Sequence, residues 1–339
     1  MRFSASAFAP ACASPNHCET DPLRLFPDAS GGEAAVTRYR VFPGMELDYR
    51  DVHARACREL RDGSGERLEI HHCLEGRVEY RQNGRYFYLS PGDLAVARTS
   101  SLPPDSRFPT GHYHGITVTI DPAAAPECLS CILSDVEVRP ATLMEKLCPG
   151  RTVFTARSSR RVKHVFSELY AVPEDIRKGY FKVKLLELLL FLSTLSPEDG
   201  QTPHGCTAAQ VTLAEQVKAC LLAESDRTLT LKSLSQQFNV SEAQIKSSFT
   251  GVYGMSPASY ARSQRMHGAA ALLRETDRTV LDIACQFGYD NASKFAKAFR
   301  DVIGVSPREY RAGAEYDSCA PQLGEKPVSL SDADAERRI

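Results

Sequence analysis

The spacing of apolar residues divides the chain into a strand-rich N-terminal half and a helical C-terminal part. Between about Val36 and Ile120, apolar and polar residues alternate over short runs, as around Leu68 and Ile70, which is the period of a half-buried strand. Asn83-Gly84 separates two such runs and predicts a two-residue hairpin turn. Several short strands with regular turns indicate a small barrel or jelly roll, and the domain is assigned to residues 36–157.

Helical spacing replaces this pattern after roughly Ser158, and a second helix is predicted from Glu174 to about Leu195. Residues 185–192 of that helix are apolar nearly all round, so the helix must be buried on more than one side. One face is expected to lie on the barrel. The other face either meets the same helix of a second subunit or is buried within one subunit, and the sequence favours neither.

Composition sets the remaining boundaries. Residues 1–35 are rich in Ala, Ser, Pro and Gly and are expected to form a disordered arm. Residues 196–206 have the Pro, Gly and polar content of an interdomain linker, and residues 312–339 have the composition of a disordered tail. The chain is thus predicted to be an α+β multidomain protein, with a helical segment at 158–195 and an all-α domain at 207–311.

One motif occurs twice in the helical domain. Residues 254–260 read Gly-Met-Ser-Pro-Ala-Ser-Tyr, and residues 304–310 read Gly-Val-Ser-Pro-Arg-Glu-Tyr. Such an internal repeat indicates that one structural unit has been used twice. Each Ser-Pro pair is expected to begin a helix, with Ser as the N-cap and Pro at the first helical position, and Ser306 with Glu309 matches a capping box.

Upstream of each motif the pattern predicts a helix, a tight turn and a second helix, which is the helix-turn-helix arrangement. The expected pairs are 231–238 with 242–250, and 280–287 with a helix that begins after Asp290 or Asn291 and ends near Asp301. Asn239 and Gly288 take the two turn positions. A further helix over 257–273 is expected to join the pairs.

The second helix of such a pair has a size that fits the major groove of DNA. Side chains on its solvent side are therefore the candidate DNA contacts, with Arg300 placed for phosphates. These candidates are Glu242, Ala243, Lys246 and Ser247 on the first unit, and Asn291, Ala292, Ser293, Lys294, Lys297 and Arg300 on the second.

Charge supports this interpretation only mildly. The whole chain has a net charge of −1, but residues 227–311 hold 12 Lys and Arg against 7 Asp and Glu, a net of +5. A basic region on a neutral chain points to nucleic acid, although a solvated basic face would carry the same excess.

Residues 207–311 resemble the DNA-binding domain of the AraC family of bacterial transcription regulators. In the first unit Ser235 stands where the family usually has Ala, and the second helix is poor in Arg, which weakens the case for this unit as a base reader. The residues that carry the resemblance are Leu234, Ser241, Phe249, Gly254 to Pro257, Tyr260 and Arg265, and then Ile283-Ala284, Phe287 to Tyr289, Phe295, Phe299, Gly304 to Pro307 and Tyr310-Arg311.

The resemblance implies a non-enzymatic transcription activator that acts in the bacterial cytoplasm. Its implied partners are double-stranded DNA, RNA polymerase, a small-molecule effector and a second copy of the chain. In many members a cupin-like sensor barrel and a helical dimerisation segment precede the DNA-binding domain, and residues 36–157 and 158–195 match that order by pattern.

Three histidines are the candidate ligand-binding residues of the predicted barrel. His72 alternates with Leu68 and Ile70, while His112 and His114 alternate with Ile116, so all three are expected to point inward. Inward imidazoles suit a metal or an anionic ligand, but hydrogen-bonded core histidines or the lining of an organic ligand site are favoured. No metal or cofactor is predicted.

The cysteine count and the hydropathy indicate the redox state of the thiols and whether the chain has a membrane partner. The 11 Cys are an odd number in a chain too long to need disulfides, which favours reduced thiols. Cys128 and Cys131 form a lone CxxC that is best interpreted as loop thiols. No run of 18 apolar residues exists, so no membrane partner is expected.

The sequence leaves two other hypotheses of function open. One is a cupin-type metal-dependent enzyme or metal sensor with an appended DNA-binding domain, which requires a bound metal. The other is an interaction module that works without DNA, and salt-dependent DNA binding would reject it.

Overall fold

The structure is a computed structural model of the chain. It describes residues 18–20, 25–27, 31–59, 65–126, 138–200, 205–223 and 230–314. The chain divides between Arg262 and Ser263 into two compact units. Within the described ranges, no helix combines the length and the apolar character needed to cross a bilayer.

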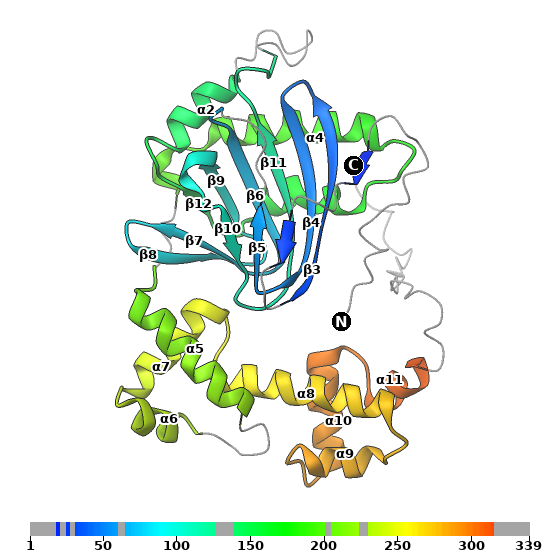
Figure 1. Cartoon of the computed structure of the whole chain (residues 1–339). Coiled ribbons are helices and arrows are strands. Elements are labelled where there is room, and N and C mark those ends of the chain that lie inside the picture. Colours follow the sequence, from blue (N-terminus) through cyan, green and yellow to red (C-terminus); the bar gives the residue numbers. More distant parts are fainter. Residues whose placement is uncertain are drawn as a thin grey trace, which may run out of the picture. The chain divides into compact units, whose positions relative to one another are not determined.

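The first unit begins with strands in three open sheets (Figure 1). The largest has the antiparallel order β1-β3-β4-β11-β6-β9-β12. Its strands are β1 Cys18–Thr20, β3 Gly32–Phe42, β4 Met45–Ala54, β6 Leu68–Gly76, β9 Leu94–Arg98, β11 Tyr113–Ile120 and β12 Phe154–Ala156. The described strands close no barrel, so the cupin-like arrangement stays a prediction.

Two smaller sheets lie against it. One has the order β10 Asp105–Arg107, β5 Ala56–Glu59 and β2 Leu25–Pro27, and the other is the hairpin of β7 Val78–Gln82 and β8 Arg85–Leu89. The hairpin turns at Asn83 and Gly84, which have φ of 50° and 71°. Both are left-handed, as a type I′ turn requires. The hairpin predicted from this dipeptide is confirmed.

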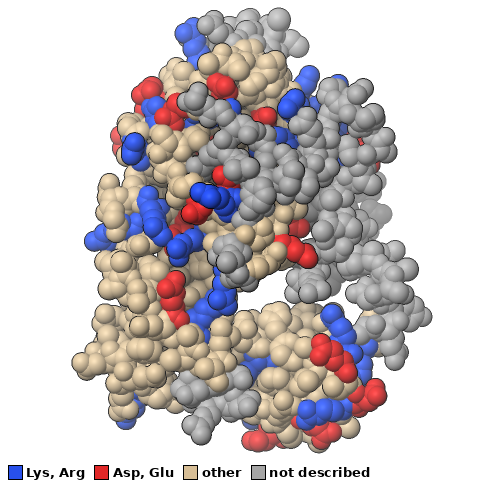
Figure 2. All heavy atoms as spheres, in the orientation of Figure 1, with Lys and Arg blue, Asp and Glu red and all other residues tan. Residues whose placement is uncertain are grey.

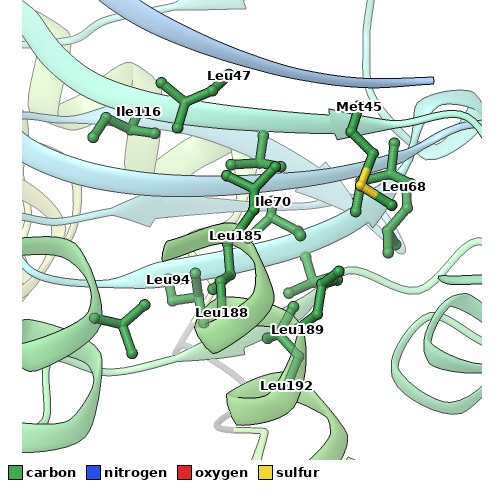
Figure 3. Packing of buried hydrophobic residues seen from close by; sticks show 14 of the residues in the cluster. Met45, Leu47, Leu68, Ile70, Leu94, Ile116, Leu185, Leu188, Leu189 and Leu192 are labelled. Atoms are coloured by element: carbon green, nitrogen blue, oxygen red, sulfur yellow. The ribbon is translucent and has the colours of Figure 1, made fainter. Parts of the chain in front are cut away.

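Both faces of the large sheet are buried. One face packs on the helices α2 Pro140–Leu147, α3 Arg160–Ser167 and α4 Arg177–Thr194. Figure 3 shows Leu185, Leu188, Leu189 and Leu192 of α4 meeting strand residues such as Ile70 and Ile116. The opposite face, with Val52, Cys73 and Tyr113, packs on residues of the small sheets such as Val78 and Leu89.

The three candidate histidines lie in different surroundings, and their ligand-binding role stays a prediction. His72 and His114 belong to the face of Ile70 and Ile116, but this face is covered by helices. His112 precedes β11 and is exposed. Alternation tells which residues share a face, but it cannot tell which face meets which neighbour when both are buried. His71 is the histidine on the opposite face, where its Nδ1 lies 3.1 Å from the Thr117 hydroxyl.

Other expectations differ in detail. Cys18–Thr20 and Leu25–Pro27 lie in the predicted disordered arm, yet they form short strands because β3 and β5 offer them backbone partners. The predicted strand region also contains the helix α2. Cys128, Cys131 and the tail beyond residue 314 lie outside the described residues.

The helix predicted from Glu174 to about Leu195 is α4. Its buried face includes Lys184, whose Nζ lies 2.6 Å from Glu187 Oε2 and 3.3 Å from Glu168 Oε2. Its other face is only partly covered, since Leu186 and Leu190 are half-buried and Val183 is 62% exposed. The chain therefore buries one broad side of α4. Beside that side, Val183, Leu186 and Leu190 form an apolar strip that is only partly covered.

His72 makes the first unit sensitive to acid. Its ring stacks on Phe166 at 4.3 Å between centroids, its Nδ1 lies 2.9 Å from Tyr170 Oη, and burial lowers its pKa from 6.5 to about 4. As the pH falls from 6.5 to 4, the unfolded chain takes up a proton that the folded chain does not. The free energy of unfolding is therefore expected to decrease by up to about 3 kcal/mol.

Urea unfolding at pH 7.5 and pH 4.5 measures this effect. His72→Gln should lose less stability between the two pH values than the parent, whereas His164→Gln, at an exposed position on α3, should lose as much as the parent. Equal pH dependence in the parent and His72→Gln would contradict the assignment.

Candidate nucleic-acid interface

Seven α-helices follow α4 in the described residues (Figure 1). They are α5 Ala208–Ala223, α6 Leu231–Phe238, α7 Glu242–Tyr253, α8 Pro257–Glu275, α9 Val280–Gln286, α10 Ala292–Ile303 and α11 Pro307–Ala314. The predicted helix–turn–helix pairs correspond to α6 with α7 and to α9 with α10. The observed ends lie within three residues of the predicted ones.

Local hydrogen bonds set the limits of α6 and α7. The Thr230 hydroxyl accepts from the Ser233 amide at 3.1 Å and caps α6. Asn239 ends that helix with φ of 51°, a left-handed conformation that Asn tolerates better than most residues. The Ser241 hydroxyl then accepts from the Gln244 amide at 3.1 Å and begins α7. These caps satisfy amides that a helix start would otherwise leave unpaired.

The second pair uses the same devices. The Thr279 hydroxyl accepts from the Asp282 amide at 3.1 Å, and Gly288 follows α9 with φ of 77°. Asn291 is the N-cap of α10, since its Oδ1 accepts from the amides of Ser293 at 2.7 Å and Lys294 at 3.4 Å. Of the two predicted caps, Asp290 and Asn291, the structure selects Asn291.

The twin motifs mark where each pair ends. Gly254 and Gly304 terminate α7 and α10 with φ of 76° and 93°, which favours glycine. The tyrosine of each motif returns to the preceding helix. Tyr260 meets Phe249 edge-on at 5.5 Å, and Tyr310 meets Phe299 edge-on at 5.6 Å.

The Ser-Pro pairs begin the helices that follow. Pro257 and Pro307 are the first residues of α8 and α11. The Ser306 amide donates to Glu309 Oε2 at 2.7 Å, and the Glu309 amide donates to the Ser306 hydroxyl at 3.2 Å. The predicted capping box is confirmed.

Each pair closes its own apolar core. The first contains Leu234, Ile245 and Phe249 with residues of α5. The second contains Ile283, Phe295 and Phe299 with residues of α8. Burial of these side chains turns the opposite sides of α7 and α10 to solvent, which is the arrangement that a groove-binding helix needs.

The predicted contact residues lie on these solvent sides. All are exposed except Ala292, which is half-buried, and each group of residues lies together on its own helix. The Ser247 hydroxyl donates to the Gln244 carbonyl at 3.1 Å, and Arg300 lies 3.9 Å from Glu309. In the described part of the chain, Lys294 and Lys297 have no ion-pair partner and keep their charge available.

Positive charge concentrates on the second pair. α7 carries Glu242 and Lys246, whereas α10 carries Lys294, Lys297 and Arg300 against Asp301. On the face seen in Figure 2, acidic and basic side chains are interspersed, which fits a chain whose net charge is −1. The exposed side of α10 therefore carries more positive charge than that of α7.

The strand-rich region also contacts α7 through the β7–β8 hairpin. Tyr86 and Cys206 exchange two backbone hydrogen bonds, at 2.9 and 2.8 Å, and Arg77 donates to the Gly251 carbonyl in α7 at 3.1 Å. A groove of about 450 Å³ is lined in part by Arg107 and Lys218, and also by Val252 and Tyr253 of α7. Sequence reasoning missed this groove because its walls come from segments far apart in the chain.

Comparisons with known proteins agree with this geometry. The family described as "Helix-turn-helix domain" matches residues 234–313. An uncharacterised HTH-type transcriptional regulator of Escherichia coli is 36% identical over 77% of this chain and 88% of its own length. A transcriptional activator named RhaR from Klebsiella pneumoniae is 32% identical over 35% of this chain and 42% of its own length.

A solved structure from Rhodopseudomonas palustris, described as a probable AraC family transcriptional regulator, has 30% identity and a TM-score of 0.29. It covers 30% of this chain and 97% of that one. The helix-turn-helix family match and the Escherichia coli relative that matches 77% of the chain define a helix-turn-helix transcription regulator. The chain belongs to the AraC family of these regulators.

The Asn291 cap should contribute measurably to stability. Asn291→Ala removes the acceptor for two α10 amides and is expected to lower the free energy of unfolding by about 1 kcal/mol. Asn291→Asp keeps the acceptor and should be nearly neutral, which makes it the matched control. Differential scanning calorimetry compares the variants, and equal midpoints for Ala and Asp would show that the cap contributes nothing.

Proposed function

We propose that this regulator binds promoter DNA through both helix pairs, with α7 and α10 entering separate segments of the major groove. The observation that carries the proposal is the matched construction of the pairs. Each has a left-handed residue between its helices, a side-chain cap on its second helix and a solvent-exposed first turn. The helix α8, continuous from Pro257 to Glu275, connects them along the chain.

The exposed residues suit different parts of DNA recognition. Lys294 and Lys297 can donate to guanine O6 and N7 or to phosphate, and Ser293 can donate or accept. Arg300, one turn further along α10, is assigned to phosphate. On α7, Lys246 and Ser247 are the corresponding donors, while Glu242 and Ala243 suit contacts that carry no positive charge, such as a cytosine amino group or a thymine methyl group. Asn291 and Ala292 complete the groove-facing end of α10.

A double variant tests the role of α10. Lys294→Ala with Lys297→Ala should weaken binding to DNA from upstream of the regulator's own gene by about tenfold or more. If both lysines contact phosphates, the slope of log K against log salt should fall by about 2. Fluorescence anisotropy with labelled duplexes at several salt concentrations gives both quantities.

The matched control removes the same charge elsewhere. Lys163→Ala with Lys182→Ala changes exposed positions on α3 and α4 and should leave affinity and slope unchanged. If the α10 double variant binds specific DNA as tightly as the parent, α10 is not a reading helix. Salt-independent binding by the parent would remove the DNA interface altogether.

We assign the sensing role to the strand-rich region, as a cupin-like domain over residues 36–157. The groove beside α7 supports this assignment, since its volume of about 450 Å³ is within the range of small-molecule sites. Arg55, Arg107 and Lys218 are cations on its wall, against Glu79 and Glu215. An effector with an anionic group fits this lining. Because Val252 and Tyr253 of α7 line the same groove, effector binding can favour one placement of α7 over another.

The remaining partners follow from the same proposal. A regulator that occupies a promoter can contact RNA polymerase, and the name of the Klebsiella relative as a transcriptional activator supports activation. The segment 158–195 is assigned to dimerisation, and residues 196–206 to the connection with the DNA-binding domain at 207–311.

The dimer proposal rests on the apolar strip of α4. Val183, Leu186 and Leu190 recur at helical spacing and are left partly or largely open to solvent, as in a helix that packs on its symmetry mate. Val183→Glu with Leu186→Glu is expected to convert a dimer into a monomer in sedimentation velocity. Lys182→Glu adds negative charge to the same helix at an exposed position beside the strip and should not. A monomeric parent would contradict the assignment.

A further inference from the structure

Three side chains of types that can ligate a metal ion meet on the strands β4 and β11. Asp51 of β4 is the register partner of His114 of β11, and His53 lies two residues further along β4, on the same face. This face is the one that α4 covers elsewhere. The cluster lies at the end of the strands, beyond the apolar rows of Leu47 and Tyr49.

The distances suit a shared ligand. Asp51 Oδ1 is 3.0 Å from His53 Nε2 and 3.2 Å from His114 Nδ1, and one ligand atom from each residue lies within 4.8 Å of the others. Two atoms that bind one zinc ion at about 2.0–2.2 Å with tetrahedral angles are themselves about 3.4 Å apart. Small side-chain rotations therefore bring all three atoms to coordination distance.

The contacts do not look like ordinary hydrogen bonds. Asp51 Oδ1 is buried and, among the described residues, accepts no hydrogen bond, although both imidazoles are within 3.2 Å. A buried carboxylate oxygen without a hydrogen bond is costly. A cation at the point where the three atoms converge removes that cost.

Exposure fits a site that an ion can enter. The side chain of His114 is 2% exposed, that of Asp51 is 12% exposed and that of His53 is 35% exposed. The buried pair is thus held by the sheet, and His53 forms the open side. On the neighbouring strand β6, Glu75 is the register partner of His114.

We propose that Asp51, His53 and His114 form a binding site for a divalent first-row transition-metal ion, with Zn²⁺ as the representative case. Two imidazoles and one carboxylate favour such ions over Mg²⁺ and Ca²⁺, which prefer oxygen ligands. Three protein ligands leave a coordination position for water or another donor. The site is distinct from the DNA-binding helices and does not depend on their role.

A titration of the full-length protein tests the proposal. The protein is first treated with EDTA and exchanged into buffer without chelator. Co²⁺ is then added while its visible absorption bands are recorded. Finally, Zn²⁺ is added to displace the Co²⁺. The parent should bind one equivalent at this site, and Mg²⁺ at the same concentrations should displace nothing. Because binding to the native state raises the unfolding temperature, Zn²⁺ should also increase the midpoint of thermal unfolding.

Two variants locate the site, and both affect residues that are not fully buried. His53→Ala and Asp51→Asn should each weaken Zn²⁺ affinity by about tenfold or more and lose the thermal shift. His164→Gln, which changes an exposed histidine on α3, should keep both. Circular dichroism confirms that each variant is folded.

The outcomes are separable from those of the DNA experiments. If the parent binds no Zn²⁺, or if both variants bind it as tightly as the parent, the site does not exist, and binding by the protein's thiols accounts for any metal found. Neither result bears on α7 or α10. Conversely, loss of DNA binding in the α10 double variant leaves the metal titration unchanged.

Discussion

Burial of the large sheet on both faces is the constraint on which the first unit depends. Leu47, Ile70 and Ile116 are fully buried against the helices, and Val52 and Cys73 are fully buried against the small sheets. Polar residues caught between these layers must find partners. Arg50 meets Glu59 at 2.7 Å, and Arg38 forms a two-point contact with Asp48. Such pairs fix the register, since a shift by one residue would separate every charge from its partner.

The cluster of Asp51, His53 and His114 is an exception on the side of the sheet that faces the helices, because that side is otherwise mostly apolar. Most of that face is aliphatic or aromatic, and Asp51 and His114 interrupt it at one end. A charged site is tolerated there because the end of the sheet remains partly open at His53.

Local pattern and local chemistry predicted the helical domain well. The capping residues Thr230, Ser241 and Ser306, the left-handed turn at Asn239 and the Ser-Pro starts are all determined within a few residues of the chain. Sequence spacing alone therefore defined the exposed sides of α7 and α10. The candidate DNA contacts follow from that spacing.

Predictions that depended on contacts between residues far apart in the sequence were less accurate. His72, His112 and His114 were grouped by alternation, but His72 stacks on Phe166, His112 is exposed, and only His114 joins a cluster. Its partners, Asp51 and His53, lie about sixty residues upstream and meet it only because β4 pairs with β11. Strand order is set by long-range packing, which periodicity does not report.

Separate apolar cores for the two helix pairs have an evolutionary consequence. Because Phe249 and Tyr260 close one core and Phe299 and Tyr310 close the other, substitutions on the outer side of α7 and α10 disturb neither interior. Free-energy changes at sites that share no contacting residues add nearly independently. Under the proposal that both pairs read DNA, one copy of the repeat can acquire new sequence preferences while the other retains affinity, so a duplicated unit lets a regulator change its target sites gradually.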